Sequence, residues 1–175
     1  MHLNAARLPA RIDGAGNLIM LFDQDRSLWD RELVLEGLRL LEFSATGQLV
    51  VEYHIEAAIA AAHSTALRVE DTDWKVIVAL YDTLMQIHSS PVVALNRAIA
   101  VAQDQGPERG IAEIEAIEDR DRLADYPFYP AALGELELRR GHLDLARKHF
   151  QAARGLARNP MEWRFLDRRI AACTK

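Results

Sequence analysis

Two short runs of the sequence carry the side chains with the greatest capacity for chemistry. The first is Asp23–Asp30 (DQDRSLWD), which places four charged groups and an indole within eight residues. Carboxylates, a guanidinium and an indole N–H form ion pairs and hydrogen bonds. These groups either tie a loop onto the body of the protein or contact a partner.

Helix capping explains only part of this run. Ser27 can accept a hydrogen bond from the first backbone N–H groups of a helix, and Asp30, three residues later, completes a pair like a capping box. A helix start needs nothing more. The polar and aromatic residues left without a capping role are Asp23, Gln24, Asp25, Arg26 and Trp29.

The second run is Ser90–Ala100 (SPVVALNRAIA). Ser90 suits an N-cap, and Pro91 suits the first helical position, where a missing N–H costs nothing. Asn96 and Arg97 then interrupt an otherwise apolar helix. A buried polar pair of this kind normally has partners, because burial without a partner costs several kcal/mol.

The two runs together suggest one network. Arg97 can pair with Asp82 or Asp73, and Thr72 or Asp71 can cap the intervening helix, with Trp74 packed between hairpins. We expect the loop Asp23–Ser27 to be held against the helices by a network of Asp23, Asp25, Arg26, Trp29, Asp82 and Arg97. The full set of candidate binding or network residues is Asp23, Asp25, Arg26, Trp29, Asp73, Trp74, Asp82, Asn96 and Arg97.

Signals of catalysis and metal binding are weak. His54 and His63 are nine residues apart on one predicted helix, so they do not share a face as an i, i+4 metal pair would. The sequence has no metalloprotease, nucleophile-elbow or phosphate-loop motif. Its one cysteine, Cys173, excludes an intramolecular disulfide and a cysteine-cluster metal site. We predict no enzyme, with no catalytic residue, metal or cofactor.

Charge is unevenly distributed along the chain. The formal net charge is −5, which argues against a surface that serves as a whole as a nucleic-acid platform. Residues 131–175 contain ten Lys/Arg and five Asp/Glu, whereas residues 1–130 contain eleven and twenty-one. The basic end either contacts an acidic partner or is a solvated helical face. No stretch is apolar enough to span a membrane and the N-terminus lacks a signal-peptide core, so we predict a cytoplasmic protein.

Composition and periodicity predict an all-α protein. Half of the residues are hydrophobic and 7% are aromatic, and from about Leu28 the apolar residues recur with a helical period. Residues 18–22 are expected to be a short extended segment packed on helices. The predicted helices cover about 28–43 (ended by Thr46-Gly47), 49–67, 73–87, 91–103, a helix opening at Pro107 that carries Ile111, Ile114 and Ile117 at a helical spacing, 130–140, 143–157 and 160–173.

Internal repetition predicts stacked antiparallel helical hairpins in a tetratricopeptide-like (TPR-like), right-handed superhelix. The best repeat is 130–160 and a weaker copy covers 94–126. Residues 160–173 form a capping helix. Residues 1–26 are expected to be a linker packed on the body, and 27–175 the helical domain. The template matches at Leu133, Gly134, Gly141, Ala146, Phe150 and Ala153, whereas Glu137 replaces an expected aromatic residue.

The chain resembles the C-terminal TPR-like extension of a group of extracytoplasmic-function (ECF) RNA polymerase sigma factors. The resemblance implies a fragment whose N-terminal sigma domains, which bind DNA and polymerase, are missing from this sequence. The matching stretches cover nearly the whole chain and are Asp23–Asp30, Ala57–His63, Thr72–Trp74 with Leu80–Asp82, Ser90–Ala100 and Ala132–Arg169.

The resemblance implies a regulatory role in transcription initiation through protein contacts. The implied partners are the parent's sigma domains, core RNA polymerase and, from gene neighbourhood in the family, a small YCII-related (DGPF) protein. The fragment itself is not expected to bind DNA or membranes. Two alternatives remain open: a free-standing TPR adaptor, and a small-molecule-binding or enzymatic domain with a polar pocket holding Arg97 and Asp25.

Overall fold

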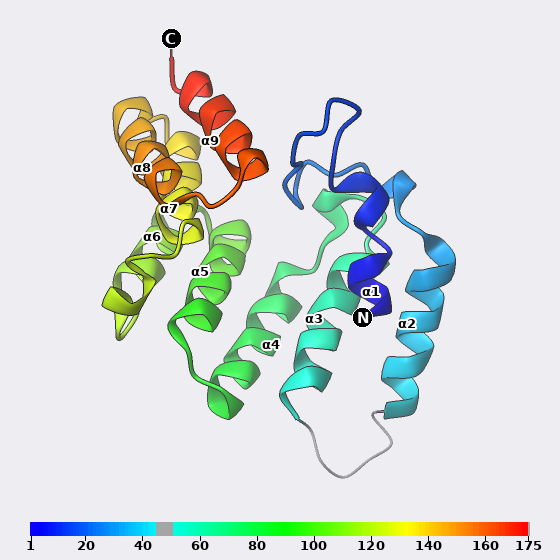
Figure 1. The fold of residues 1–175 in the computed structure, drawn as a ribbon. Helices are drawn as coiled ribbons and strands as arrows, with labels where there is room; N and C mark the ends of the chain where they lie inside the picture. The colour runs from blue at the N-terminus through cyan, green and yellow to red at the C-terminus, as the bar shows by residue number, and fades with distance from the viewer. Residues whose placement is uncertain (45–50, 175) are drawn as a thin grey trace. The chain divides into compact units, whose positions relative to one another are not determined.

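The computed structural model describes residues 1–44 and 51–174. Within these ranges the regular structure is helical, apart from one isolated antiparallel bridge between Ile12 and Leu18. The predicted all-α class is therefore confirmed. The predicted helix end at Thr46-Gly47 and helix start near residue 49 lie outside the described residues. The α-helices are α1 His2–Ala5, α2 Arg31–Ser44, α3 Glu52–Thr65, α4 Trp74–Ile87, α5 Pro91–Gln105, α6 Pro107–Glu115, α7 Phe128–Arg139, α8 Leu143–Leu156 and α9 Pro160–Ala172 (Figure 1).

The chain divides into two compact units, Met1–Ser89 and Ser90–Lys175. The predicted boundary between residues 26 and 27 lies inside the first unit.

Four short 3₁₀ helices supplement the α-helices, three in the first unit and one in the second, within the described ranges. They are η1 Leu8–Ala10, η2 Arg26–Leu28, η3 Val69–Asp71 and η4 Arg120–Leu123.

In the first unit, helices adjacent in sequence pack on one another. α2 contacts α1 and α3, and α3 also contacts α4. Apolar residues of α1, α2 and α3 form a common core that includes Leu3, Val34 and Ala61. Gly37 allows the closest approach: a Cβ at this position would lie 2.7 Å from Leu3 Cγ. The absence of a side chain on α2 therefore makes room for α1.

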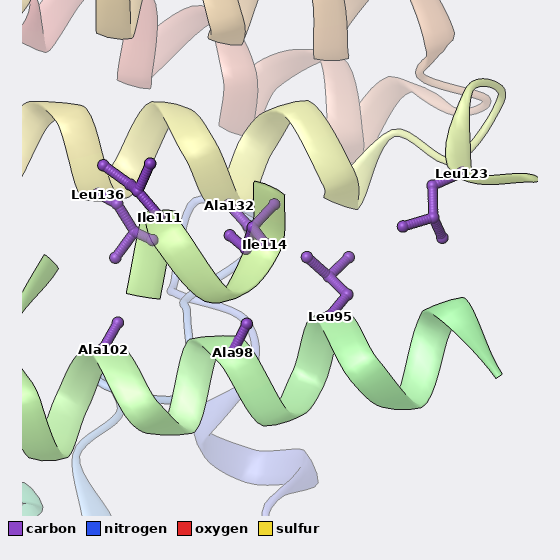
Figure 2. Packing of buried hydrophobic residues seen from close by; sticks show 8 residues of the cluster. All are labelled: Leu95, Ala98, Ala102, Ile111, Ile114, Leu123, Ala132 and Leu136. Atoms are coloured by element: carbon purple, nitrogen blue, oxygen red, sulfur yellow. The ribbon is translucent and has the colours of Figure 1, made fainter. Parts of the chain in front are cut away.

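In the second unit, α5, α6 and α7 share a core. Its buried members, all shown in Figure 2, are Leu95, Ala98, Ala102, Ile111, Ile114, Leu123, Ala132 and Leu136. Ile111 and Ile114 come from one face of α6, as their three-residue spacing predicted. The prediction is wrong for Ile117, because α6 ends at Glu115, although Ile117 still packs against this core partly buried. Small residues on α5 let α6 approach closely, while the isoleucines and leucines fill the space between the three helices.

Replacing Gly110 with Ala should destabilise the second unit. A Cβ on Gly110 would lie 2.3 Å from Ala102 Cβ and 3.0 Å from Ala102 Cα, and backbone cannot move aside as a flexible side chain can. We expect a loss of roughly 1–3 kcal/mol of unfolding free energy, typical of overpacking. Urea denaturation measures it. The double variant Gly110→Ala/Ala102→Gly should recover part of the loss; equal stability of Gly110→Ala and the parent chain would contradict the close packing.

The hairpin of α7 and α8 packs around Phe150. This side chain is fully buried, and a Cβ on Gly134 would lie 2.8 Å from its ring, so the two helices meet at Gly134 and Phe150 as the repeat pattern predicted. α9 covers the other side through Leu166 and Cys173, which belong to the same core as Phe150. The turn between α7 and α8 contains Gly141 at φ 80°, a conformation that favours glycine.

Glu137, the residue that replaces the expected aromatic, is a buried carboxylate that closes this turn. Its oxygens accept hydrogen bonds from Arg140 Nη1 at 3.0 and 3.1 Å and lie 2.7 Å from His142 Nδ1. Burial of a carboxylate is tolerated when charged donors surround it. The aromatic packing of the template is therefore replaced by a local ionic clamp.

Candidate functional site

Arg26 is the centre of the candidate site in the first unit, and it is only 3% exposed. Its Nη1 donates hydrogen bonds to the carbonyl oxygens of His63, Ala66 and Arg68 at 3.1, 3.0 and 3.2 Å. Its Nη2 donates to Thr72 Oγ1 at 3.0 Å. The last carbonyls of a helix have no donor within that helix and carry partial negative charge. Arg26 therefore caps the C-terminal end of α3 from a distant part of the chain.

Trp29 forms one wall of this site and is 2% exposed. The guanidinium of Arg26 lies 5.0 Å from the centroid of its ring, and that of Arg7 lies 5.9 Å away. Both distances are within the range of cation–π attraction. The indole therefore gives the buried guanidinium of Arg26 a favourable electrostatic contact in place of water. Because Arg7 also lies against this ring, Trp29 connects the N-terminal residues to the cap of α3.

Two aspartates fix the backbone on either side of Arg26. The carboxylate of Asp25 accepts hydrogen bonds from the backbone N and Oγ of Ser27 at 2.9 and 2.6 Å, and these bonds, the side-chain one foremost, lower the pKa of Asp25. Asp30 Oδ1 accepts from the backbone N of Glu32 and Leu33, both at 3.0 Å. The prediction that Ser27 caps the first long helix is therefore wrong: Asp30 caps α2, and Asp25 starts η2.

The remaining predicted residues of the first unit differ in their surroundings. Asp73 Oδ1 accepts from the backbone N of Val76 at 3.1 Å and caps α4, so the prediction of Thr72 or Asp71 as the cap is wrong. The Thr72 hydroxyl instead receives Arg26, as described above. Trp74 packs against Phe22 and His63, with ring centroids 5.6 and 5.3 Å apart. Asp23 and Asp82 are exposed.

His63 is buried at the end of α3 and is held in its neutral form. Burial, followed by the positive charges of Arg7 and Arg26, lowers its pKa to about 4. Its Nδ1 has no hydrogen-bond partner. A protonated imidazole here would add a cation to a place that already contains two guanidinium groups, so the charged form is disfavoured on both counts.

The first unit should lose stability in acid because of His63. A histidine with a lowered folded-state pKa contributes stability above its unfolded pKa of about 6.5, and the contribution is lost as pH falls towards 4. A shift of this size corresponds to roughly 3 kcal/mol at pH 4. Urea denaturation between pH 7 and pH 4, read from Trp29 and Trp74 in a Trp163→Phe background, measures the slope. His63→Gln should flatten it; an unchanged slope would contradict a neutral buried His63.

In the second unit, Arg97 forms an ion pair with Glu113 of α6, and Glu113 also pairs with Arg109. Asn96 is exposed, so the expectation that both polar residues of this run are buried is wrong for Asn96. The predicted link from Arg97 to Asp82 or Asp73, and with it the single network, would join the two units and stays a prediction. The structure brings together Arg26, Trp29 and Trp74 within the first unit.

The sequence reasoning missed the contacts of three residues, two in the first unit and one in the second. Arg7 lies against Trp29, Thr72 binds Arg26 through its hydroxyl, and Glu113 pairs with Arg97. Of these three, only Glu113 could have been predicted to form an ion pair from a local pattern, because Arg109 and Glu113 are spaced i, i+4 on one helix. The polar groups at the centre are mostly guanidinium, indole and backbone carbonyls, which suit structural locking or partner contact better than bond-breaking chemistry.

The surface hollows and the distribution of metal-binding residues do not point to a further site around Arg26. In the residues that the structure describes, no group of three or more His, Cys, Asp or Glu could hold a metal ion. Two open hollows, of about 410 and 510 Å³, lie beside Thr65, Asp71 and Asp73 in the first unit and beside His142, Arg147 and Cys173 in the second. Neither is lined by Asp25 or Arg97. No helix of the described ranges is long and apolar enough to cross a membrane.

Comparison with known proteins finds similar sequences, but their descriptions name no activity. Residues 1–45 match DUF6596, a family of unknown function. Over 160 residues the chain is 40% identical to Uncharacterized protein R00370 of Rhizobium meliloti (strain 1021). That match covers 91% of this chain and 37% of the relative, so the chain spans little more than a third of the relative's length. No solved structure matches the chain. Arg7, Arg26 and Trp29 lie within the DUF6596 match, whereas Arg97 lies beyond it.

Proposed function

We propose that this chain is a regulatory, protein-interaction domain of an ECF sigma factor, and that it acts in the cytoplasm on transcription initiation. Its partners are the sigma domains of the same parent, core RNA polymerase, or a YCII-related (DGPF) protein. The domain takes no part in catalysis. Its hairpins belong to a TPR-like right-handed superhelix, in which a groove receives a helix or a peptide.

The observation that carries this proposal is the role of the Asp23–Asp30 run, which is part of the sigma-factor resemblance but foreign to the generic repeat. The run has a defined structural purpose, because Arg26 and Trp29 anchor it to the C-terminal end of α3. An anchor at this point joins the N-terminal residues to the helical body. A domain that regulates whatever precedes it in a parent chain needs such a firm attachment.

The comparison with the Rhizobium relative agrees with a role as one domain of a longer protein. The aligned region makes up 37% of that relative, which leaves length for further domains. A free-standing adaptor is the main alternative. It would account for the hairpins but gives no reason for the Arg26 anchor near the N-terminal end.

A binding experiment tests the proposal. The 175-residue chain is used to capture the separately purified sigma domains and core RNA polymerase at low and at high salt. Capture of the sigma domains would support an intramolecular regulator, and capture of polymerase alone would support a docking element. If the chain captures neither the sigma domains nor core RNA polymerase at either salt concentration, the sigma-factor proposal is overturned. The same capture with an Arg26→Lys variant tests whether the interaction depends on the Arg26 anchor. Arg39→Ala, which changes a side chain that is 81% exposed, is the folded control.

A further inference from the structure

Four buried nitrogen atoms around the indole of Trp29 have no hydrogen-bond partner among the described residues. They are Arg7 Nε, Arg26 Nε, Trp29 Nε1 and His63 Nδ1. The residues Arg26, Trp29 and His63 are only 3, 2 and 8% exposed. Nearly all buried polar atoms in native proteins have a partner, either in the protein itself or in a bound molecule. This group of atoms therefore points to a bound species.

The four side chains lie within one small region of the first unit. The guanidinium groups of Arg26 and Arg7 lie 5.0 and 5.9 Å from the centroid of the Trp29 ring. Arg26 also donates to the backbone carbonyl of His63. Burial, followed by the charges of Arg11 and Arg26, lowers the pKa of Arg7. The two guanidinium groups are thus close enough to repel each other.

Neither guanidinium has a carboxylate partner in the part of the chain that the structure describes. Their hydrogen bonds go to neutral amide, carbonyl and hydroxyl oxygens. The exposed carboxylates Glu70 and Asp71 act on Arg26 through their charge alone, and Asp71 bonds Arg68 instead. Buried charges are normally paired, because an uncompensated charge in a protein interior is costly. The bound species should therefore be negative.

We propose that a small anion of halide size binds between the guanidinium groups of Arg7 and Arg26, at the N–H edge of the Trp29 indole. Guanidinium and indole nitrogens donate hydrogen bonds and cannot accept them. A water molecule would bring two O–H donors of its own, for which this group offers at most one acceptor, His63 Nδ1. An anion accepts from the three donors and also compensates the two positive charges.

Burial limits the size of the ligand. The four nitrogen atoms are closed off from solvent, so a phosphate group or a peptide carboxylate is too bulky to reach them together. Arg7 is the half-buried member, and its guanidinium lies close to the ~6 Å limit of a cation–π contact. Movement of the Arg7 side chain therefore provides the entrance. Chloride and bromide have the required size and charge. The inference does not depend on the sigma-factor proposal.

Bromide quenching of Trp29 fluorescence tests the proposal. Trp29 is the one remaining tryptophan in a Trp74→Phe/Trp163→Phe background. Free bromide seldom reaches an indole that is 2% exposed, whereas bromide bound beside it quenches it. With bromide exchanged for gluconate at constant ionic strength, quenching should saturate, and added chloride should reverse it. The 41% exposed Trp163, in a Trp29→Phe/Trp74→Phe background, should show linear quenching that chloride does not reverse.

A matched pair of arginine variants separates direct contact from general charge. Arg7→Gln should weaken bromide binding by at least about tenfold, the equivalent of one hydrogen bond to a charged group. Arg11→Gln removes the same charge from an exposed side chain whose charge also acts on Arg7. It should weaken binding by less than about threefold, because salt screens an exposed charge. Circular dichroism confirms that each variant is folded.

Thermal unfolding of the unsubstituted 175-residue chain gives a second readout. The melting temperature should rise with the logarithm of the chloride concentration when chloride replaces gluconate at constant ionic strength, as for any ligand that binds the folded state alone. Linear quenching of Trp29 that chloride does not reverse, with no effect of chloride on melting, would overturn the proposal and leave water as the partner of these donors. Equal bromide affinities of Arg7→Gln and Arg11→Gln would also overturn it.

Discussion

Replacing Arg26 with Ala should lower the unfolding free energy of the first unit by roughly 3–5 kcal/mol, because several buried acceptors lose their donor. The substitution leaves the carbonyls of His63 and Ala66 and the hydroxyl of Thr72 buried without their donor. Each orphaned acceptor costs about 1–3 kcal/mol, partly relieved by local rearrangement. The indole of Trp29 also loses the cation that covers it.

The measurement is urea denaturation in a Trp163→Phe background, where Trp29 and Trp74 report on the first unit alone. Arg26→Lys should give an intermediate loss, because an ammonium group can bond to carbonyls but lacks the planar fork of a guanidinium. Arg39→Ala removes an arginine of the same unit whose side chain is 81% exposed, and it should change little. Equal midpoints for Arg26→Ala and Arg39→Ala would rule out the anchor.

Replacing Phe150 with Ala should destabilise the second unit by roughly 3–5 kcal/mol, the range for a large aromatic residue in a core. Phe150 is fully buried among residues of α8 and α9 and lies directly against Gly134 of α7. The close approach at Gly134 leaves backbone on one side of the ring, which cannot collapse into the space that the substitution opens. We therefore expect most of the cavity to persist.

The measurement is urea denaturation followed by the fluorescence of Trp163 on α9, in a Trp29→Phe/Trp74→Phe background where Trp163 is the one remaining tryptophan. Phe128→Ala is the matched control, because Phe128 is also an α7–α8 hairpin aromatic but is 52% exposed. A Phe150→Ala chain with the stability of Phe128→Ala would show that the hairpin does not depend on this ring.

The helices could be predicted because their start signals are local. Ser90 and Pro91 stand at the N-cap and first position of α5, and Pro107 stands at the first position of α6, as the sequence pattern predicted. Asn159 and Pro160 hold the same two positions in α9. The core face of α6 followed from the spacing of its isoleucines. These features depend on residues within one helical turn of each other, so the sequence alone contains the required information.

The candidate site was predicted only in part. Arg26 and Trp29 were identified as residues that a helix start does not need, but their partners were not. Arg26 binds mainly backbone carbonyls, and every residue in the sequence has a carbonyl, so no residue type marks the acceptors. The cap of α2 was misassigned because Asp25, Ser27 and Asp30 all have capping chemistry within six residues. Tertiary position decided among them.

The cap at Ser90 has a consequence for how such a protein can change over generations. Ser90 Oγ accepts a hydrogen bond from the backbone N of Val93 at 3.2 Å, so the second unit carries its own helix start from its first residue. A genetic exchange at the boundary before Ser90 would transmit α5 together with the signal that starts it, and the hairpins that follow with their own signals. Duplication or replacement of the coding segment for the second unit would therefore transmit its helix start signals together with its helices.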